Sequence, residues 1–151
     1  MNVLIPVKSL SAAKSRLAGY LSLEERKKLM LQMLTHVITT IKSCETITQI
    51  AIVTPDKSVI QLAKQNGIKI LPEEKPGYNE ALTYAAQHEN EHPLLTIAAD
   101  LPLVTTQDIL HTVLQGARFS SHHHHQSVLV GAVWRLLSDY SLVFLVDNVC
   151  H

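Results

Sequence analysis

The sequence predicts an α/β fold in which helices cover a mostly parallel sheet on both faces. Short apolar runs alternate along the chain with longer segments whose apolar residues recur every three or four positions. This alternation is typical of parallel sheets, because each crossover between neighbouring strands carries a helix. With 151 residues, 46% of them hydrophobic and 17% charged, the chain has the length and composition of one globular domain.

The first half of the chain contains three predicted strands, at residues 3–7, 49–54 and 68–71, and two predicted helices, at residues 22–42 and 55–66. Ser22 and Glu25 form a capping box that starts the first helix. Gly67 follows the second helix and is a typical stop, because glycine readily adopts a left-handed conformation. In the second half we expect helices at 78–87 and 106–115 and a strand at 92–98. Residues 128–134 and 142–146 are further candidate strands.

The loop after the first strand is the first candidate functional segment. It carries three cations, Lys8, Lys14 and Arg16, and the residues between them are mainly serine and alanine. Small side chains let main-chain N–H groups approach a phosphate, and the cations neutralise its charge. The alternative is a solvated basic loop. The carboxyl end of a strand is where α/β sheets bind ligands, so the pattern favours a polyphosphate site.

Asp100 is the second candidate. It stands just beyond the carboxyl end of the predicted strand at 92–98 and precedes a turn at Pro102. A carboxylate in this place can hold Mg²⁺ against substrate phosphates. Such residues also cap helices, but Thr105 with Asp108 supplies a cap for the helix that follows. The sequence therefore predicts a role for Asp100 in chemistry.

Together these segments resemble the 2-phospho-L-lactate guanylyltransferase family of coenzyme F-420 biosynthesis, which includes bacterial relatives that use phosphoenolpyruvate. The motifs that carry the resemblance are IPVKSLSAAKSRL near the N-terminus, LSLEER at 21–26, GYNEAL at 77–82 and ADLPL at 99–103. They occur in the family's order and cover about residues 1–117. The resemblance implies a three-layer nucleotidyltransferase sandwich of the GT-A, Rossmann-like type.

The resemblance also implies an activity, the transfer of GMP from GTP to 2-phospho-L-lactate or phosphoenolpyruvate with release of pyrophosphate. The implied catalytic residues are Lys14, Arg16 and Asp100, with Asp100 as the Mg²⁺ ligand. The implied nucleotide-binding residues are Pro6, Val7, Lys8, Lys14, Ser15, Arg16, Asn79 and Asp100. The implied acceptor-binding residues are Asn79, Leu101 and Pro102. Asn79 also fits a plain helix cap.

After about residue 118 the sequence departs from the family pattern. A Gly-Thr-Asn-Ala-Leu segment and a later aspartate-rich segment, which would supply a second metal-binding carboxylate, have no counterpart. We therefore expect a nucleotidyltransferase-like domain at 1–117 and an atypical tail at 118–151, in a chain that is truncated, frame-shifted or diverged. Four histidines at 122–125 are interpreted as a loop with incidental metal affinity, since one regular element cannot aim all four at one ion.

Composition excludes several other classes. The net charge is zero and the pI about 7.1, which argues against a general nucleic-acid or membrane surface. The N-terminus does not resemble a signal peptide, and no apolar run reaches the roughly 18 residues of a membrane span. Cys44 and Cys150 match no disulfide or metal spacing. We expect a cytoplasmic protein, and a homodimer is left open.

Two other functions stay open at this level. One is another GT-A nucleotidyltransferase, acting on a sugar phosphate or the molybdenum cofactor, although those families usually have a glycine-rich loop in place of AKSRL. The other is a non-catalytic remnant that folds and binds a nucleotide. A comparison of GTP with CTP and ATP discriminates the first, and binding without turnover would identify the second.

Overall fold

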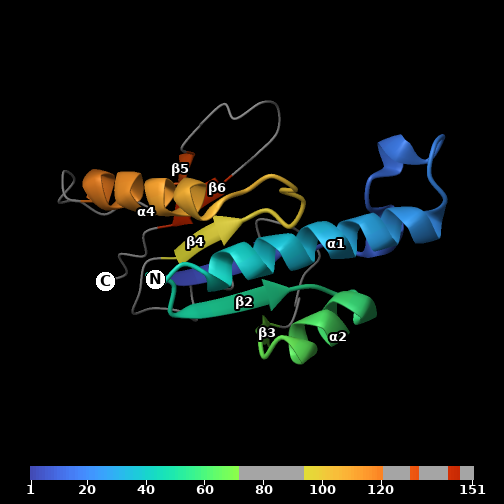
Figure 1. Cartoon of the computed structure of the whole chain (residues 1–151), viewed down its shortest axis with the longest axis horizontal. Coiled ribbons are helices and arrows are strands. Elements are labelled where there is room, and N and C mark those ends of the chain that lie inside the picture. Colours follow the sequence, from blue (N-terminus) through green and yellow to red (C-terminus); the bar gives the residue numbers. More distant parts are fainter. Residues whose placement is uncertain (72–93, 121–129, 133–142, 147–151) are drawn as a thin grey trace.

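A six-stranded sheet with the order β3-β2-β1-β4-β6-β5 organises the molecule (Figure 1). The computed structural model describes residues 1–71, 94–120, 130–132 and 143–146. The strands are β1 (Asn2–Pro6), β2 (Gln49–Val53), β3 (Lys69–Leu71), β4 (Leu94–Ile97), β5 (Val130–Ala132) and β6 (Val143–Val146). The helices are α1 (Leu23–Lys42), α2 (Lys57–Gln65) and α4 (Thr106–Ser120), with two 3-10 turns, η1 (Leu10–Ala12) and η2 (Ser15–Leu17).

The first four strands pair in parallel, as predicted. β1 lies between β2 and β4, and β3 pairs with β2 on the outer side. The two later candidate strands are present as β5 and β6, both shorter than expected and both antiparallel to their neighbours. The sheet is therefore mostly parallel with an antiparallel edge, a common form of α/β sheet.

Apolar side chains of α1 and the central strands form the core. Val37 and Ile41 of α1 are fully buried, as are Leu4 and Ile5 of β1. α1 lies in front of the sheet in Figure 1 and contacts α4, while α2 contacts β3 and α4 contacts β6. α1 thus buries an apolar stripe along one face. The expected helix at 78–87 lies outside the described residues.

The predicted helix boundaries are confirmed at three starts and at two ends, those of α1 at Lys42 and of α2 before Gly67. Ser22 Oγ accepts a hydrogen bond from Glu25 N at 3.3 Å, and the Glu25 carboxylate accepts one from Ser22 N at 2.8 Å, so the capping box is complete. Asp56 caps α2, and Gly67 follows that helix at φ +65°. Thr105 and Asp108 bond reciprocally at the start of α4. That helix continues to Ser120, beyond its predicted end at residue 115.

Two further observations concern membrane-spanning helices and the cysteines. Within the described ranges, no helix is both long and apolar enough to span a bilayer. Cys44 is buried and forms no disulfide there, and burial raises the pKa of its thiol. Cys150 lies outside the described residues.

Candidate functional site

Three loops meet at the carboxyl edge of the parallel strands. They follow β1, β2 and β4, and the order β2-β1-β4 places the loop after β1 between the other two. In Figure 1 the loop after β1, with its two 3-10 turns, projects beyond the start of α1. This arrangement brings the predicted basic loop and the predicted strand-end aspartate to one edge of the sheet.

Lys14 and Asp100 are in direct contact at this edge. The Lys14 Nζ donates to Asp100 Oδ2 at 2.7 Å, although the two residues lie 86 positions apart in the sequence. Their side chains are 31% and 43% exposed, so the pair is open to a ligand from solvent. The contact joins the AKSRL motif to the ADLPL motif.

Lys14 also has an unusual backbone. Its φ of 49° and ψ of 41° lie in the left-handed region, and no other non-glycine residue of the described ranges has a positive φ. A residue with a side chain at Cβ is strained there by about 1–2 kcal/mol. Strain of this kind persists where surrounding contacts hold it, and it is concentrated at binding sites. Lys14 is therefore held in place by the loop.

The other predicted residues of this loop differ in exposure. Lys8, Ser15 and Arg16 are exposed, and neither Lys8 nor Arg16 forms an ion pair within the part of the chain that the structure describes. Pro6 ends β1, and Val7 is buried with its N–H bonded to Val53 O at 2.9 Å. The structure thus places Lys8 and Arg16 at the surface and buries Val7.

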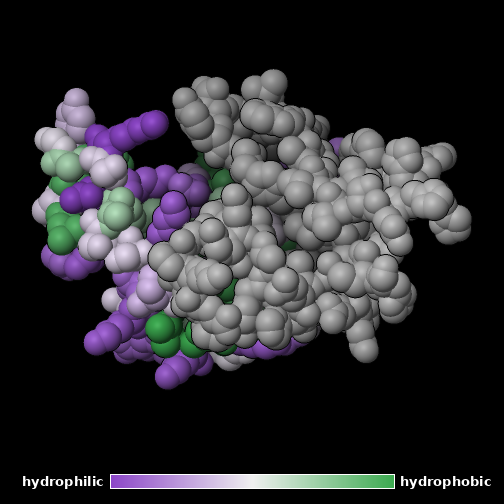
Figure 2. Space-filling view, turned by 180° about the vertical axis from the view of Figure 1, so that it is seen from behind, coloured by the Kyte–Doolittle hydropathy of each residue, from purple (hydrophilic) through white to green (hydrophobic). Residues whose placement is uncertain are grey.

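The surface at the loop is open rather than enclosed. Figure 2 shows this end of the molecule at the left, where hydrophilic residues lie beside a few hydrophobic ones. Tyr20, at the end of the loop, is 88% exposed. A ligand has direct access to the cations from solvent.

The segment after β4 is held in place around Asp100 by buried neighbours and by a hydrogen bond to α1. Ala99 and Leu101 are buried on either side of it, and Pro102 is exposed. The Nε2 of His36, on α1, forms a 3.0 Å hydrogen bond with Val104 O. Capping of α4 by Thr105 and Asp108 leaves Asp100 without a capping role, as the sequence predicts.

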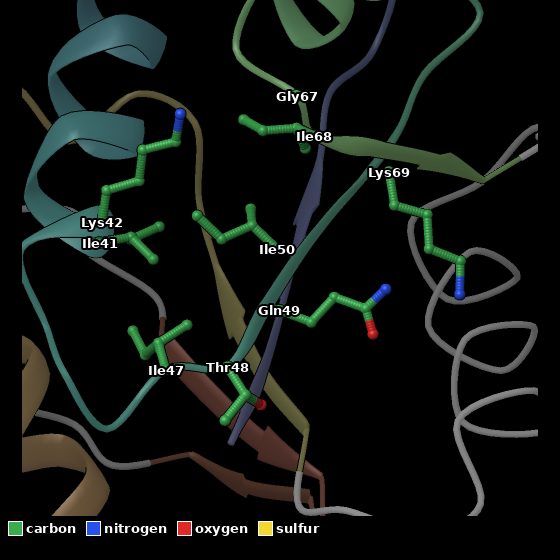
Figure 3. Close-up of a pocket in the computed structure, with 9 residues that line it drawn as sticks. All are labelled: Ile41, Lys42, Ile47, Thr48, Gln49, Ile50, Gly67, Ile68 and Lys69. Atoms are coloured by element: carbon green, nitrogen blue, oxygen red, sulfur yellow. The ribbon is translucent and has the colours of Figure 1, made fainter.

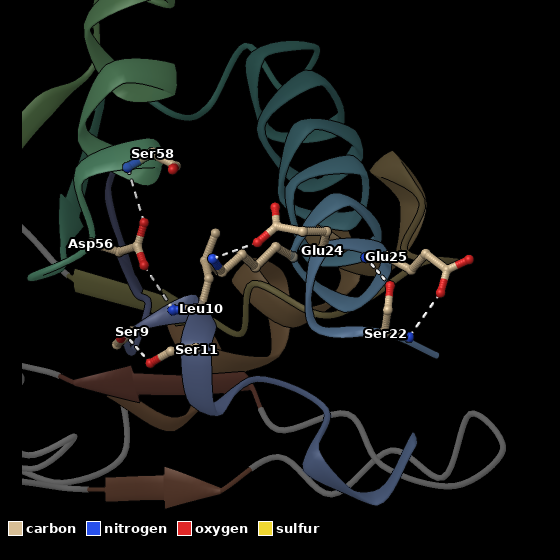
Figure 4. Close-up of polar contacts among 9 residues, drawn as sticks. Ser9, Leu10, Ser11, Ser22, Glu24, Glu25, Asp56 and Ser58 are labelled. Atoms are coloured by element: carbon tan, nitrogen blue, oxygen red, sulfur yellow. Dashed lines mark hydrogen bonds and ion pairs between the residues drawn. The ribbon is translucent and has the colours of Figure 1, made fainter. Parts of the chain in front are cut away.

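Asp56 is a residue whose contact with the loop the sequence analysis missed. Its Oδ2 accepts a hydrogen bond from Leu10 N at 2.8 Å, while its Oδ1 accepts from Ser58 N at 3.0 Å at the start of α2 (Figure 4). The sequence identifies residues 55–56 only as a helix start. Its position at the carboxyl end of β2, the strand beside β1, is the signal that places it at the same edge.

Arg26, in the LSLEER segment, is a second missed residue. Its Nη1 donates to Ala13 O at 3.0 Å, which connects the first turn of α1 to the loop. Its Nε is buried and has no hydrogen-bond partner among the described residues. The motif marks Arg26 in the sequence, but only the fold shows what it contacts.

Asp100 is the carboxylate that the sequence predicts as the metal ligand at this site. No group of three His, Cys, Asp or Glu residues that could hold an ion occurs within the described ranges. Mg²⁺ is commonly bound through one or two carboxylates together with substrate phosphates and water. Asp100, in contact with Lys14 of the basic loop, fits that pattern. Asn79 and residues 122–125 lie outside the described residues.

A pocket of about 330 Å³ lies at the other edge of the sheet, where β2 and β3 begin (Figure 3). Ile41, Ile47, Ile50 and Ile68 give it apolar walls. None of its lining residues belongs to the loops after β1, β2 or β4. This pocket is therefore separate from the candidate site.

Sequence comparison identifies a family for this arrangement. The family described as Guanylyl transferase CofC like matches residues 1–120. A phosphoenolpyruvate guanylyltransferase of Sphaerobacter thermophilus is 36% identical over 108 residues, covering 70% of this chain and 52% of that protein. A 2-phospho-L-lactate guanylyltransferase of Methanocaldococcus vulcanius is 34% identical over 110 residues, covering 72% and 48%. The chain spans about half the length of these curated relatives.

Solved structures are similar in fold. A cytidylyltransferase from Leptospira borgpetersenii superposes with a TM-score of 0.60 at 13% identity, over 97% of this chain and 60% of that one. A CMP:2-keto-3-deoxy-manno-octonic acid synthetase in complex with CTP superposes with a TM-score of 0.58 at 20% identity, over 80% and 48%. At such identities the likeness shows the fold alone. It confirms the nucleotidyltransferase type of α/β sandwich.

Proposed function

The chain belongs to the Guanylyl transferase CofC like family, and from this premise we propose that it transfers GMP from GTP to 2-phospho-L-lactate or phosphoenolpyruvate. Pyrophosphate is the second product, and the reaction belongs to coenzyme F-420 biosynthesis. The names of the relatives support the substrate class. The observation that carries the proposal is the 2.7 Å contact between Lys14 and Asp100, because it unites the two motifs on which the family resemblance rests.

The proposed reaction is an in-line displacement at phosphorus. A phosphate oxygen of the acceptor attacks the α-phosphorus of GTP, a new P–O bond forms, and the bond to the departing pyrophosphate breaks. The acceptor phosphate is already ionised, so no strong general base is needed. Catalysis therefore depends on positioning and on stabilising negative charge.

The cations of the loop supply that stabilisation in our proposal. Lys8 and Arg16 are exposed and available to the triphosphate. Lys14 exchanges its contact with Asp100 for a phosphate oxygen when the nucleotide binds. The loop then holds the charge that accumulates on pyrophosphate as it leaves.

Asp100 is the proposed ligand of Mg²⁺. A bound Mg²⁺ would neutralise charge shared between the nucleotide phosphates. The half-exposed carboxylate of Asp100 can accept such an ion once Lys14 has moved to the phosphates. Asn79, Leu101 and Pro102 remain the proposed contacts of the acceptor acid, and the cytoplasm remains the proposed location.

Thermal unfolding with GTP, ATP or CTP, each with and without Mg²⁺, tests the nucleotide half of the proposal. A ligand at about one hundred times its dissociation constant adds roughly 2.7 kcal/mol to the free energy of unfolding. For a domain of this size that corresponds to several degrees. We expect the shift with GTP and Mg²⁺. The absence of any shift would contradict the proposal.

Turnover measurements test the second part of the proposal, the transfer of GMP to an acceptor. Release of pyrophosphate from GTP is measured with 2-phospho-L-lactate, with phosphoenolpyruvate and without an acceptor. The second candidate is a protein that binds the nucleotide without transferring it. A GTP-dependent thermal shift with no pyrophosphate release would favour that candidate. A shift with CTP instead of GTP would favour another nucleotidyltransferase of the same fold.

A further inference from the structure

We propose that Asp56 is a positioning residue for the phosphate loop, which we define as residues 8–17. Its carboxylate holds the main chain at Leu10 in the conformation that presents Lys14 to the nucleotide. The inference rests on the proposed function, because the loop that it positions is the one proposed to bind the triphosphate. Asp56 itself is not a proposed ligand of the nucleotide.

The two oxygens of Asp56 serve two different segments. Oδ1 accepts from Ser58 N at 3.0 Å and from Val59 N at 3.4 Å, which caps α2. Oδ2 accepts from Leu10 N at 2.8 Å, across 46 residues of sequence (Figure 4). A helix cap needs a single oxygen, which serine or threonine supplies. The second bond uses the oxygen that only a carboxylate leaves available.

Asp56 is itself held in place. The hydroxyl of Thr54 accepts a hydrogen bond from Asp56 N at 3.1 Å, and Thr54 is buried at the end of β2. Asp56 is therefore attached to the end of β2 through its main-chain N–H and to α2 through its carboxylate. A group fixed in this way can define the position of a neighbouring loop.

Leu10 is a suitable point of attachment because its side chain is also fixed. That side chain is 1% exposed and belongs to the hydrophobic core. With its N–H bonded to Asp56, Leu10 is held by both its side chain and its main chain. The N–H is also occupied, so its contribution to a phosphate site is indirect.

A second side chain holds the loop three residues further on. Arg26 Nη1 donates to Ala13 O at 3.0 Å, directly before Lys14. Residues 10–13 are thus held at both ends, by Asp56 from α2 and by Arg26 from α1. Ordering a loop costs backbone entropy for each residue that becomes fixed. Contacts that order it before the ligand arrives improve affinity for the ligand.

The pair of variants Asp56→Ser and Asp56→Ala separates positioning from capping. Serine has one side-chain oxygen, which can still cap α2. It has no second oxygen to accept the hydrogen bond from Leu10 N. Alanine removes both contacts. We expect the affinity for GTP with Mg²⁺ to fall roughly tenfold or more in both variants, with KM affected more than kcat. Only Asp56→Ala is expected to lower the unfolding midpoint substantially, because it alone loses the cap.

A helix cap without a positioning role gives a different result. In that case Asp56→Ser binds GTP as the wild-type chain does, and the proposal is overturned. Asp56→Asn provides an independent check. Its amide keeps one oxygen for the cap and turns an NH₂ group toward Leu10 N, so we expect it to behave like Asp56→Ser in nucleotide affinity.

Hydrogen exchange at the Leu10 amide tests the hydrogen bond to Asp56 in the absence of any nucleotide. We expect the amide to be protected in the wild-type chain and to exchange faster in Asp56→Ser. Equal exchange in the two proteins overturns the positioning role, whatever the nucleotide data show. A wild-type chain that binds no nucleotide while its Leu10 amide is protected through Asp56 instead contradicts the proposed function.

Discussion

The two edges of the parallel sheet are held together in different ways. At the amino edge, isoleucines such as Ile41 and Ile68 line an apolar pocket, and main-chain bonds such as Thr48 N to Met1 O at 2.9 Å join the segments. At the carboxyl edge, charged side chains make the connections, as in Lys14 with Asp100. The amino edge is stabilised by burial, whereas the carboxyl edge keeps loops in fixed positions at the surface.

The lysines of the two edges illustrate the difference. Lys42 Nζ donates to Asn66 O at 2.8 Å, at the end of α2, which is a typical way to satisfy the last carbonyl groups of a helix. Lys14 instead contacts a carboxylate and has a strained backbone. Charge alone does not identify a functional lysine. The partner and the backbone conformation distinguish the two.

Substitution of Asp100 is expected to have the largest effect at the carboxyl edge. Asp100→Asn replaces the charged ligand proposed for Mg²⁺ by a neutral amide and should lower guanylyl transfer about a thousandfold, or roughly 4 kcal/mol. The pair with Lys14 is partly exposed, so the free energy of unfolding should change by about 1 kcal/mol or less. Pyrophosphate release and thermal unfolding measure the two quantities. Glu45→Gln, an exposed carboxylate before β2, is the control, and equal activity in both variants would refute the assignment.

Arg16→Ala should have the next largest effect. Arg16 is exposed and proposed to stabilise the departing pyrophosphate, so its loss should reduce kcat about a hundredfold, or nearly 3 kcal/mol. Steady-state kinetics with GTP and each acceptor check this. Lys64→Ala, in the last turn of α2, removes an exposed cation away from the loop and should leave kcat unchanged. Unchanged turnover in Arg16→Ala would contradict its catalytic role.

The amino edge should respond in stability rather than in activity. Ile41 is fully buried, and Ile41→Val should lower the free energy of unfolding by about 1 kcal/mol because it removes one buried methyl group. Denaturant unfolding measures this loss. Turnover per folded molecule should equal that of the wild type. Reduced turnover at full folding would show that the two edges are coupled.

The smallest expected effect concerns pH and the start of α1. Hydrogen bonds from the main chain and then the hydroxyl of Ser22 lower the pKa of Glu25. A carboxyl group whose folded pKa is lowered stabilises the fold above its unfolded pKa, and this contribution disappears as the pH falls through the folded value. In Glu25→Gln the free energy of unfolding should therefore fall slightly less as the pH is lowered, which is measured by unfolding at a series of acidic pH values. Identical curves for the two proteins would exclude this contribution.

Local features of the fold were predictable from the sequence. The strands, the capping box of Ser22 and Glu25 and the stop at Gly67 depend on neighbouring residues, so a short window contains the signal. The nearness of Lys14 and Asp100 was also predictable in outline, because both follow parallel strands and the carboxyl ends of such strands share one edge. The family motifs support the same pair.

The contacts of Asp56 and Arg26 were not predictable in this way. Both side chains bond to main-chain groups of a distant loop, at Leu10 N and Ala13 O. Main-chain groups are the same at every residue, so the sequence carries no mark of which one is the partner. The left-handed conformation of Lys14 is equally hidden, since lysine has no preference for it.

The sequence by itself determined the class of fold, the alternation of its elements and the membership in the CofC-like family. Periodicity and motifs involve residues that are close together in the sequence, so they can be recognised without the structure. Tertiary structure alone decided which strands are neighbours, that β6 runs antiparallel to both β4 and β5, and how the phosphate loop is held. The physical reason is the distance along the sequence over which each kind of interaction acts. Apolar patterns act over a few residues, whereas strand order and hydrogen bonds between loops depend on how the whole chain packs.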